Sequence, residues 1–421
     1  MSSLLVILLC SVIAAQSEEV AKPPELFPEL KNGIESFTDK LTGILYKQAL
    51  PNTNVVVSPL NIFGAFSVLL YGADGNTREE IANFLGFPSA NEQFIAAHKN
   101  FGEFLKSLEI KKFGPCDFRD DVNETACIYE DVSVANGIFL HKEYSLVSSY
   151  AENLQSYYRG AVENVDFANE PVGATNRINK WISEKTHDLI PDLFKEPVDS
   201  SVRMIIAATL YFSAKWPRRT FHTFRSRPEK FTTETGEEKV EYIYYEKAVP
   251  YYEGDNFKAI SLEYMGGDFE TIFVLPNINI SITDFVESFS KAQVHKIFNE
   301  SASESVLYKI PCIETEWSKD LVESLKSLNL TGIFEEANLS KLISKGSGPL
   351  KISKVRHSTK LKLDEKGTVA SGATTFEIST KSGRVGPPPI EFIVNRPFML
   401  IIYHKHSSIP LFTAIIRNPT V

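Results

Sequence analysis

The segment from Glu365 to Pro389 contains the residues of this 421-residue chain that are best suited to chemistry. It begins with a run of small residues, Gly367 to Ala373, and two later peptide bonds follow a basic residue, Lys381–Ser382 and Arg384–Val385. Trypsin-like proteases cleave after Lys or Arg, because an acidic residue in their specificity pocket pairs with the basic side chain. Since a loop of more than about 15 structureless residues is uncommon unless it is functional, we interpret this segment as functional rather than as an ordinary surface loop.

The same segment is also suited to become a β-strand. It contains no proline before Pro387, and a proline cannot join the interior of a sheet because it lacks the N–H that the neighbouring strand needs. The part of the segment that could join a sheet therefore lies before Pro387. Side chains alternate between the two faces of a strand, so one face would carry small residues: Thr368, Ala370, Gly372 and Thr374.

Other kinds of chemistry find little support in the sequence. The net charge of -9 gives no attraction to nucleic-acid phosphates, and after the N-terminus no apolar run reaches the roughly 18 residues that span a bilayer. The chain has no Gly-x-Ser-x-Gly motif of a hydrolase and no Cys/His spacing typical of zinc, so we expect neither an enzyme nor a metal or cofactor. A sulfated polysaccharide is not expected either, because glutamates dilute the lysines near the helix expected at 92–108: Lys99, Lys106, Lys111 and Lys112.

Residues 1–17 are typical of a secretory signal. The run from Leu4 to Ala15 is almost entirely apolar, and small residues and then two glutamates follow it. It is too short to span a membrane and has the length of a signal h-region. We therefore expect a secreted, extracellular protein from which this segment is removed.

Three cysteines remain after removal of the signal. Cys116 and Cys127 flank a short polar stretch, and a disulfide between them is expected in an oxidising compartment. Cys312 lies in an apolar run and is expected to stay a free, buried thiol. Secretion also makes five Asn-x-Ser/Thr sequons candidates for glycosylation: Asn123, Asn279, Asn299, Asn329 and Asn338.

Hydrophobic periodicity predicts a helix-rich first half and a strand-rich second half. Ser58 followed by Pro59, and Thr77 followed by Glu80, are typical helix starts, the latter as a capping box. The expected helices are 30–46, 58–70, 77–85, 92–108 and 172–186. The expected strands are 132–140, 204–212, 259–264, 271–275, 392–394, 398–403 and 411–416. Strand 204–212 is apolar enough to be buried on both faces, and the whole predicts one large α+β domain over residues 27–421.

Five short motifs, in order along the chain, resemble those of the serpins. The resemblance covers nearly the whole mature chain. It implies a single serpin domain with about nine helices, three β-sheets and an exposed reactive-centre loop, with hinge and loop at 365–395. Four of the motifs are Asn54 to Pro59, Phe212 to Trp216, Asn395 to Phe398, and Ser408 to Phe412 with Asn418 to Thr420. The fifth is similar to the hinge of inhibitory serpins: Glu365, Lys366, Gly367 and Thr368 with Ala370, Gly372 and Ala373.

The resemblance implies inhibition without catalysis. A serpin offers its loop to a serine protease, forms an acyl-enzyme, and inserts the cut loop into its central sheet, which carries the protease to the opposite end and distorts it. The implied partner is a trypsin-like serine protease in covalent complex, and the implied state of the inhibitor is a monomer. The sequence resembles secreted arthropod members, which restrain protease cascades in immunity and melanisation. The alternative is a non-inhibitory relative that acts as a carrier, storage protein or chaperone, and the small hinge residues favour inhibition.

The resemblance also implies a polar cluster beneath the opening sheet and a tryptophan, here Trp216, at the breach. Ser58 and His357 match the cluster. Ala208 stands where a strand asparagine is usual, and Asn61 stands where a second helix serine is usual. We interpret this as a swap, in which the Asn61 amide replaces the one missing at Ala208; the alternative is a weaker cluster.

The position of the bait bond is the first testable prediction. The family's usual spacing of about seventeen residues, counted from Glu365, reaches Lys381, whereas the stretch from Ser382 to Asn395 is long for the family and favours Arg384. With trypsin, we expect the released C-terminal fragment to begin at Ser382, as read by N-terminal sequencing. A fragment that begins at Val385 would move the bait to Arg384.

Overall fold

Two large β-sheets with one helix buried between them form the centre of the molecule. The computed structural model describes residues 24–88, 90–114, 127–158, 160–222, 225–345, 350–368 and 387–421. Helix α2 (Pro59–Gly72) is buried at every position except Tyr71, as expected for a helix that is apolar all round. It packs against one sheet through β19 and against the other through β3 and β6.

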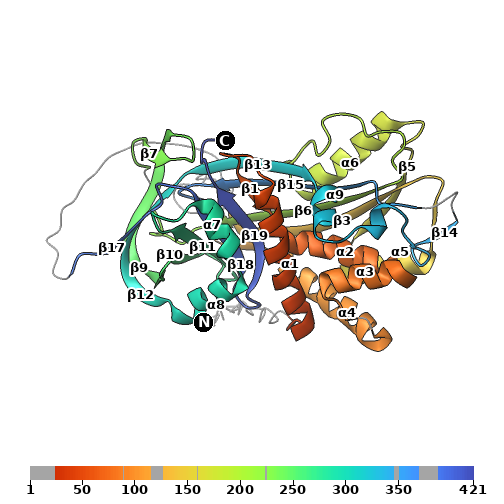
Figure 1. Ribbon diagram of the computed structural model, residues 1–421, viewed down its shortest axis with the longest axis horizontal. Helices are drawn as coiled ribbons and strands as arrows, with labels where there is room; N and C mark the ends of the chain where they lie inside the picture. The colour runs from red at the N-terminus through yellow and green to blue at the C-terminus, as the bar shows by residue number, and fades with distance from the viewer. Residues whose placement is uncertain are drawn as a thin grey trace, which may run out of the picture.

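The described residues contain nine α-helices, which confirms the expected number. Helix α6 lies on the outer side of the strands that α2 covers from within (Figure 1). The helices are α1 (Pro28–Lys47), α2 (Pro59–Gly72), α3 (Gly75–Leu85), α4 (Asn91–Leu108), α5 (Ser148–Tyr158), α6 (Pro171–Lys185), α7 (Ile282–Ser288), α8 (Lys291–Glu300) and α9 (Val322–Ser327), with a 3-10 turn η1 at Gly332–Phe334.

The central sheet has the strand order β13-β15-β16-β6-β3-β2, and β5 pairs with β3. Its strands are β2 (Lys111–Gly114), β3 (Cys127–His141), β5 (Ala161–Val165), β6 (Met204–Lys215), β13 (Ile313–Asp320), β15 (Lys354–Leu363) and β16 (Gly367–Thr368).

The second sheet has the order β1-β19-β18-β11-β10-β9-β12-β17. Its strands are β1 (Val55–Val57), β9 (Tyr242–Glu253), β10 (Phe257–Glu263), β11 (Phe269–Pro276), β12 (Ala302–Pro311), β17 (Ile390–Ile393), β18 (Phe398–His404) and β19 (Ile409–Ile416). Two small sheets pair β4 (Ser145–Leu146) with β14 (Ile343–Lys345) and β7 (Glu229–Thr232) with β8 (Glu237–Val240).

The α+β class is confirmed, and all the expected helices and strands are present. The described strands divide into two large and two small sheets rather than three, because β9 is hydrogen-bonded to β10 and so joins β12 and β17 to the second sheet. Strand β6 is buried on both faces, as its apolar run predicted. Ile206 and Ala208 face the core that contains α2, whereas Ile205 and Ala207 face the cluster under α6.

The predicted capping box at Thr77 is wrong. Helix α3 begins at Gly75, before Thr77. The Thr77 hydroxyl instead accepts from the Asn338 N–H at 2.9 Å, and the Glu80 carboxylate accepts from the Thr331 N–H at 2.8 Å. Both polar side chains therefore tie α3 to a segment some 250 residues away rather than to its own first turn.

Helix α6 packs tightly on the outer face of the central sheet. Ile178 and Trp181 of α6 join Phe139 of β3 in one buried cluster. A Cβ atom at Gly137 would lie 2.9 Å from the Trp181 ring, so only glycine allows this close approach. Helix α6 thus covers the outer face of β3 and β6.

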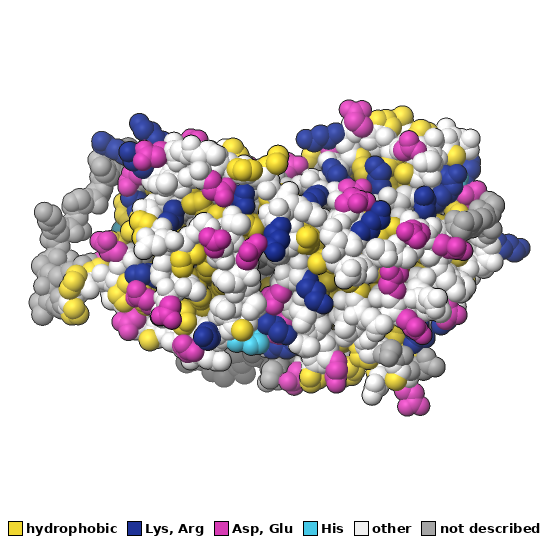
Figure 2. Space-filling model, viewed as in Figure 1, with side chains coloured by type: hydrophobic (Ala, Val, Ile, Leu, Met, Phe, Trp, Pro, Cys, Tyr) yellow, Lys and Arg dark blue, Asp and Glu magenta, His cyan; other side chains and the backbone are white. Residues whose placement is uncertain are grey.

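The four lysines considered for polysaccharide binding all contact neighbours. Lys106 donates to the Ser156 carbonyl and Lys99 lies 5.9 Å from the centre of the Tyr157 ring. Lys111 pairs with Asp131, and Lys112 lies between Glu130 and Asp268. Basic and acidic side chains are interspersed on the face shown in Figure 2, which gives no single-sign field there.

Several expectations concern residues at the surface or outside the described ranges. Cys127 is buried, whereas its expected partner Cys116, the signal segment 1–17 and Asn123 lie outside those ranges, so the disulfide stays a prediction. Cys312 is a free thiol, but it is half-buried rather than fully buried. In the described part of the chain, no helix has the length and apolar character of a membrane span. Four sequon asparagines are exposed: Asn279, Asn299, Asn329 and Asn338.

Candidate functional site

The central sheet is split between β6 and β15. At one end, Lys354–His357 of β15 pair in parallel with Ile205–Ala208 of β6, a stretch that we call the seam. At the other end, the two-residue strand β16 lies between them, with Thr368 paired to Ala214 on one side and to Leu363 on the other. Among the described residues, nothing pairs Thr209–Ser213 of β6 on the side that faces β15. We call this stretch the opening, and it has room for one more strand.

A tight turn carries the chain from β15 into β16. The Asp364 carboxylate accepts from the backbone N–H groups of Lys366 at 2.9 Å and Gly367 at 3.3 Å. The Asp364 N–H in turn donates to the Gly367 carbonyl at 3.0 Å. Burial raises the pKa of Asp364. We call residues 364–367 the hinge turn, and its shape depends on this one carboxylate.

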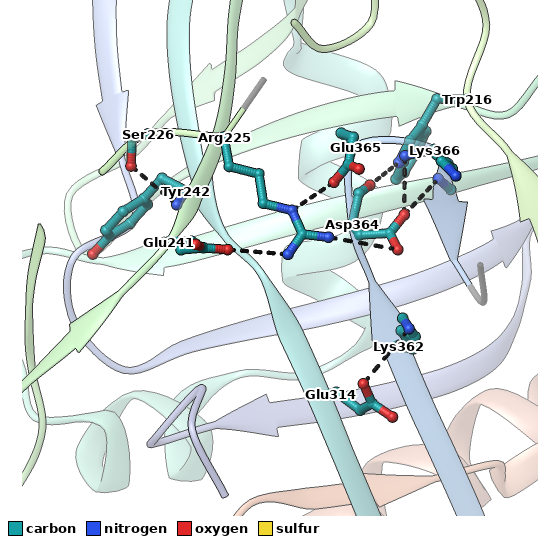
Figure 3. Close-up of polar contacts among 11 residues, drawn as sticks. Trp216, Arg225, Ser226, Glu241, Tyr242, Glu314, Lys362, Asp364, Glu365 and Lys366 are labelled. Atoms are coloured by element: carbon teal, nitrogen blue, oxygen red, sulfur yellow. Dashed lines mark hydrogen bonds and ion pairs between the residues drawn. The ribbon is translucent and has the colours of Figure 1, made fainter. Parts of the chain in front are cut away.

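Arg225 clamps the hinge turn from outside the strand (Figure 3). Its guanidinium donates to Glu365 at 2.7 Å and to Glu241 at 3.0 Å, and it lies 4.0 Å from the Asp364 carboxylate. Burial opposes the charge on Arg225, but the hydrogen bonds to Glu365 and Glu241 and the neighbouring negative charges together outweigh burial and raise the pKa of the guanidinium. Sequence reasoning missed Arg225, because its partner Glu365 lies 140 residues further along the chain.

Trp216 and Tyr264 form the floor of the hinge. The Trp216 indole N–H donates to the Asp364 carbonyl at 3.1 Å, and its backbone N–H donates to the Lys366 carbonyl at 3.0 Å. Tyr264 stacks on Trp216 with ring centres 4.3 Å apart, and its hydroxyl is 2.7 Å from that of Thr368. Thr368 is therefore buried and hydrogen-bonded at the first position of the extra strand.

Gly367 is required by its distance from β6. A Cβ atom at this position would lie 2.2 Å from the Ala214 carbonyl oxygen and 2.9 Å from the Lys215 Cα. Both are backbone atoms and cannot move aside as the end of a flexible side chain could. Only glycine therefore lets β16 enter between the two strands.

His357 holds the seam from its inner face. Its Nε2 accepts from the Ser58 N–H at 3.0 Å, so Nδ1 carries the proton and donates to the Ala208 carbonyl at 3.0 Å. The imidazole is fully buried, and this burial lowers its pKa to about 4, although the bond to Ala208 opposes the shift. A neutral His357 thus links β15 to both α2 and β6.

The predicted swap at Asn61 is wrong as a direct replacement. Asn61 is fully buried, yet neither its amide nitrogen nor its oxygen has a hydrogen-bond partner in the described structure. A different amide lies at the same level of the sheet. Asn136 of β3 stands directly opposite Ala208, and Ala208 pairs on its other side with His357. A Cβ atom at Gly64 of α2 would lie 3.0 Å from the Asn136 amide nitrogen. The sequence does contain a sign of Asn136, because an asparagine is unusual inside the apolar strand expected at 132–140.

The structure gathers the predicted site residues into two groups at opposite ends of the opening. Glu365, Gly367, Thr368 and Trp216 lie together at the hinge turn, and Ser58, Asn61 and His357 at the seam. The remaining predicted residues of the hinge and the bait lie outside the described residues: Ala370, Gly372, Ala373, Lys381, Ser382, Arg384 and Val385. In the described part of the chain, no group of His, Cys, Asp and Glu is arranged to hold a metal ion.

Comparison with known proteins decides the family. The sequence matches the profile of the family described as Serpin (serine protease inhibitor) over residues 32–419. The chain is a serpin. Iripin-2 of Ixodes ricinus is 27% identical to this serpin over 376 residues, which cover 86% of this chain and 87% of Iripin-2. Intracellular coagulation inhibitor 1 of Tachypleus tridentatus is 25% identical over 372 residues, which cover 87% and 85% of the two chains.

Solved structures agree with this serpin's fold. Serpin48 of the insect Tenebrio molitor matches with a TM-score of 0.74 and 25% identity, over 93% of this chain and 98% of that one. The thyroxine-binding globulin complex with thyroxine matches with a TM-score of 0.79 and 20% identity, over 92% and 99%. At that identity the second match shows the fold alone.

Arg225 should control how firmly this serpin holds its hinge. Replacing it in Arg225→Met leaves two buried carboxylates without their cation. Because its side chain is 30% exposed, we expect a loss of only ~1 kcal/mol. Hydrogen exchange at the Gly367 and Thr368 amides should then be about fivefold faster. The matched control is the exposed Arg227→Met, which should change nothing, and unaltered exchange in Arg225→Met would contradict the clamp.

Acid should weaken the seam through His357. The folded-state pKa is about 4, below the ordinary value of about 6.5, so the unfolded chain binds the proton first as the pH falls. The stabilising contribution is complete above pH 6.5 and is lost between about 6.5 and 4, up to ~3 kcal/mol. Denaturant titrations of wild type and His357→Gln at several pH values should show a shallower pH dependence for the variant. Parallel curves would exclude His357 as the titrating group.

Proposed function

We propose that this serpin is a secreted inhibitor of trypsin-like serine proteases that traps the acyl-enzyme by inserting its cut loop into the central sheet. The observation that carries the proposal is the position of β16, because Thr368 already occupies one strand position between β6 and β15. The opening, Thr209–Ser213 of β6, begins directly next to this position. Its natural setting would be an extracellular protease cascade of the kind that controls arthropod immunity and melanisation.

The register of β16 supports insertion of the residues that follow. Thr368 pairs antiparallel with Ala214, so a strand that continued downward would bring Thr374 opposite Ala208 and Ile378 opposite Met204, the first residue of β6. The even-numbered side chains would face α2, and these are small or apolar throughout. Glu377 would face the outer side of the sheet, opposite Ile205, rather than α2.

The polar cluster supports the same register. At the level of Ala208, the inserted Thr374 would lie beside His357, above α2. The Ser58 hydroxyl and both amide atoms of Asn61 are buried there without partners. Buried polar atoms without partners cost free energy. The hydroxyl of Thr374, inserted at this level, could form hydrogen bonds with these atoms and recover part of that cost.

The length of β6 favours Lys381 as the bait. Residues 368–378 would fill the whole side of β6 from Ala214 to Met204. Lys381 would then lie three residues beyond the end of the strand and Arg384 six. A protease attached to Lys381 would be held on the shorter tether and pressed harder against the end of the sheet.

The trapping reaction is ordinary acyl transfer that stops halfway. The serine oxygen of the protease attacks the carbonyl carbon of Lys381, the bond to Ser382 breaks, and the Ser382 amine takes up the proton. The ester between the protease and Lys381 would normally be hydrolysed by water. Insertion distorts the active site before that step, so the ester persists.

The carrier alternative requires a cavity for the cargo molecule, and the cavity between α1, α8 and β18 does not meet this requirement. It has a volume of about 40 Å³, and Glu35, Asp39 and Lys291 are in its lining. A single benzene needs a cavity of about 150 Å³. This cavity is therefore too small to hold an apolar cargo molecule, and a carrier would have to use another site.

Incubation with trypsin tests the proposal directly. We expect a complex that survives denaturing gel electrophoresis, together with a released C-terminal fragment. Thr368→Arg should abolish the complex and turn the protein into a substrate, because an arginine cannot be buried beside Tyr264 at low cost. Val369→Arg is the matched control and should still inhibit, because the side chain at this position would face outward in an inserted strand. Cleavage of the wild type without any complex would reject the proposed function.

A further inference from the structure

The seam is the part of the central sheet that must open when a strand enters. It consists of the four residue pairs Lys354–His357 with Ile205–Ala208 and a flanking hydrogen bond from the Ser353 N–H to the Met204 carbonyl at 3.1 Å. Above it, β6 and β15 are already separated by the position that β16 occupies. The energy barrier to entry of a strand therefore depends on these few residues. Contacts that bridge the seam on either face of the sheet raise this barrier.

Phe194 bridges the seam on the outer face. It belongs to the link between α6 and β6, and only 9% of it is exposed. Its ring centre lies 6.0 Å from the Lys354 ammonium and 5.9 Å from the Arg356 guanidinium carbon. Both cations are carried by β15, within the distance at which a cation is attracted to an aromatic face. The ring of Phe194 thus rests on the strand that must move.

The backbone of Phe194 is fixed to the other side of the seam. The Asn179 side-chain amide donates to the Phe194 carbonyl at 2.8 Å, and the Phe194 N–H donates to the Asn179 amide oxygen at 3.0 Å. A third tie joins the Val198 N–H to the Thr175 hydroxyl at 2.9 Å. Asn179 and Thr175 belong to α6, which packs on β3 and β6. The link is therefore attached to the β6 half of the sheet.

We propose that Phe194, positioned by Asn179, is a clasp that holds the seam closed and sets the rate at which the loop enters the sheet. The clasp rests on the proposed function, since it matters only if a strand enters. Entry moves β15 away from β6 by one strand spacing, about 4.8 Å, which takes both cations out of reach of the ring. The contact therefore stabilises the uninserted form and not the inserted one. His357 performs the same task on the inner face.

The test compares intact protein with protein nicked in the loop by a metalloprotease that is not inhibited. Phe194→Ala should lower the thermal midpoint of the intact form and change that of the nicked form much less. At 37 °C, intact Phe194→Ala should also acquire the nicked form's midpoint three- to tenfold faster than wild type. Phe194→Trp keeps an aromatic face over the cations and should restore the slow rate. Phe167→Ala, in the same outer cluster but stacked on His141, is the matched control and should lower both midpoints together.

The outcomes separate the clasp from the proposed function. If Phe194→Ala lowers the two midpoints equally, Phe194 is a packing residue and the clasp is rejected. If intact and nicked wild type melt at the same temperature, the proposed function fails instead. The double variant Lys354→Met/Arg356→Met keeps the ring and the apolar stems but removes the charges. If Phe194→Ala does not fold, the double variant tests the same contact. An unchanged rate of conversion of the intact double variant to the form with the nicked protein's midpoint would overturn the proposal.

Discussion

The whole arrangement depends on backbone hydrogen bonding across the gap between β6 and β15. Strands in the middle of a sheet normally pair along their full length, because unpaired N–H and carbonyl groups in the interior cost free energy. Here the two strands pair with each other only at the seam and accept two residues of β16 at the other end. The sheet is therefore incomplete in its folded form. In the proposed mechanism the residues that follow Thr368 supply the missing strand, and the open state persists because entry is slow rather than because it is unfavourable.

Charge and aromatic stacking hold the open end, whereas the buried imidazole of His357 and the buried ring of Phe194 hold the closed end. At the hinge turn, Asp364 shapes the backbone and Arg225 neutralises Glu365. At the seam, His357 reaches two backbone groups from within. The two ends are thus controlled by different interactions: a salt- and charge-dependent one at the hinge, and a neutral, acid-sensitive one at the seam.

The sequence predicted what is local or periodic. Alternation and apolar runs located the strands of both sheets, including β6 with its two buried faces, and small residues marked the hinge. Polar pairs between distant segments were beyond such reasoning. Arg225 meets Glu365 only because the link after β6 returns over the hinge, and Asn136 faces α2 only because of the register of β3 on β6.

The wrong predictions at Thr77 and at Asn61 have the same origin. Thr77 and Glu80 have the spacing of a capping box, but each bonds to backbone near η1. Asn61 has the right chemistry to satisfy His357, but backbone groups of Ser58 and Ala208 already do so. In both cases a side chain was assigned to the nearest partner along the sequence or within the motif, whereas tertiary packing supplied another.

The fixed position of Thr368 also limits how the loop can change in evolution. Because side chains alternate between faces, one residue inserted directly after Thr368 would turn every later side chain to the opposite face of the entering strand. Glu377 would then point at α2 instead of at the outer face of the sheet. Two inserted residues would keep the faces and lengthen only the tether. In the proposed mechanism, the length of the loop between β16 and the bait can therefore drift in steps of two, whereas beyond the bait it is free to vary by any number without altering the inserted strand.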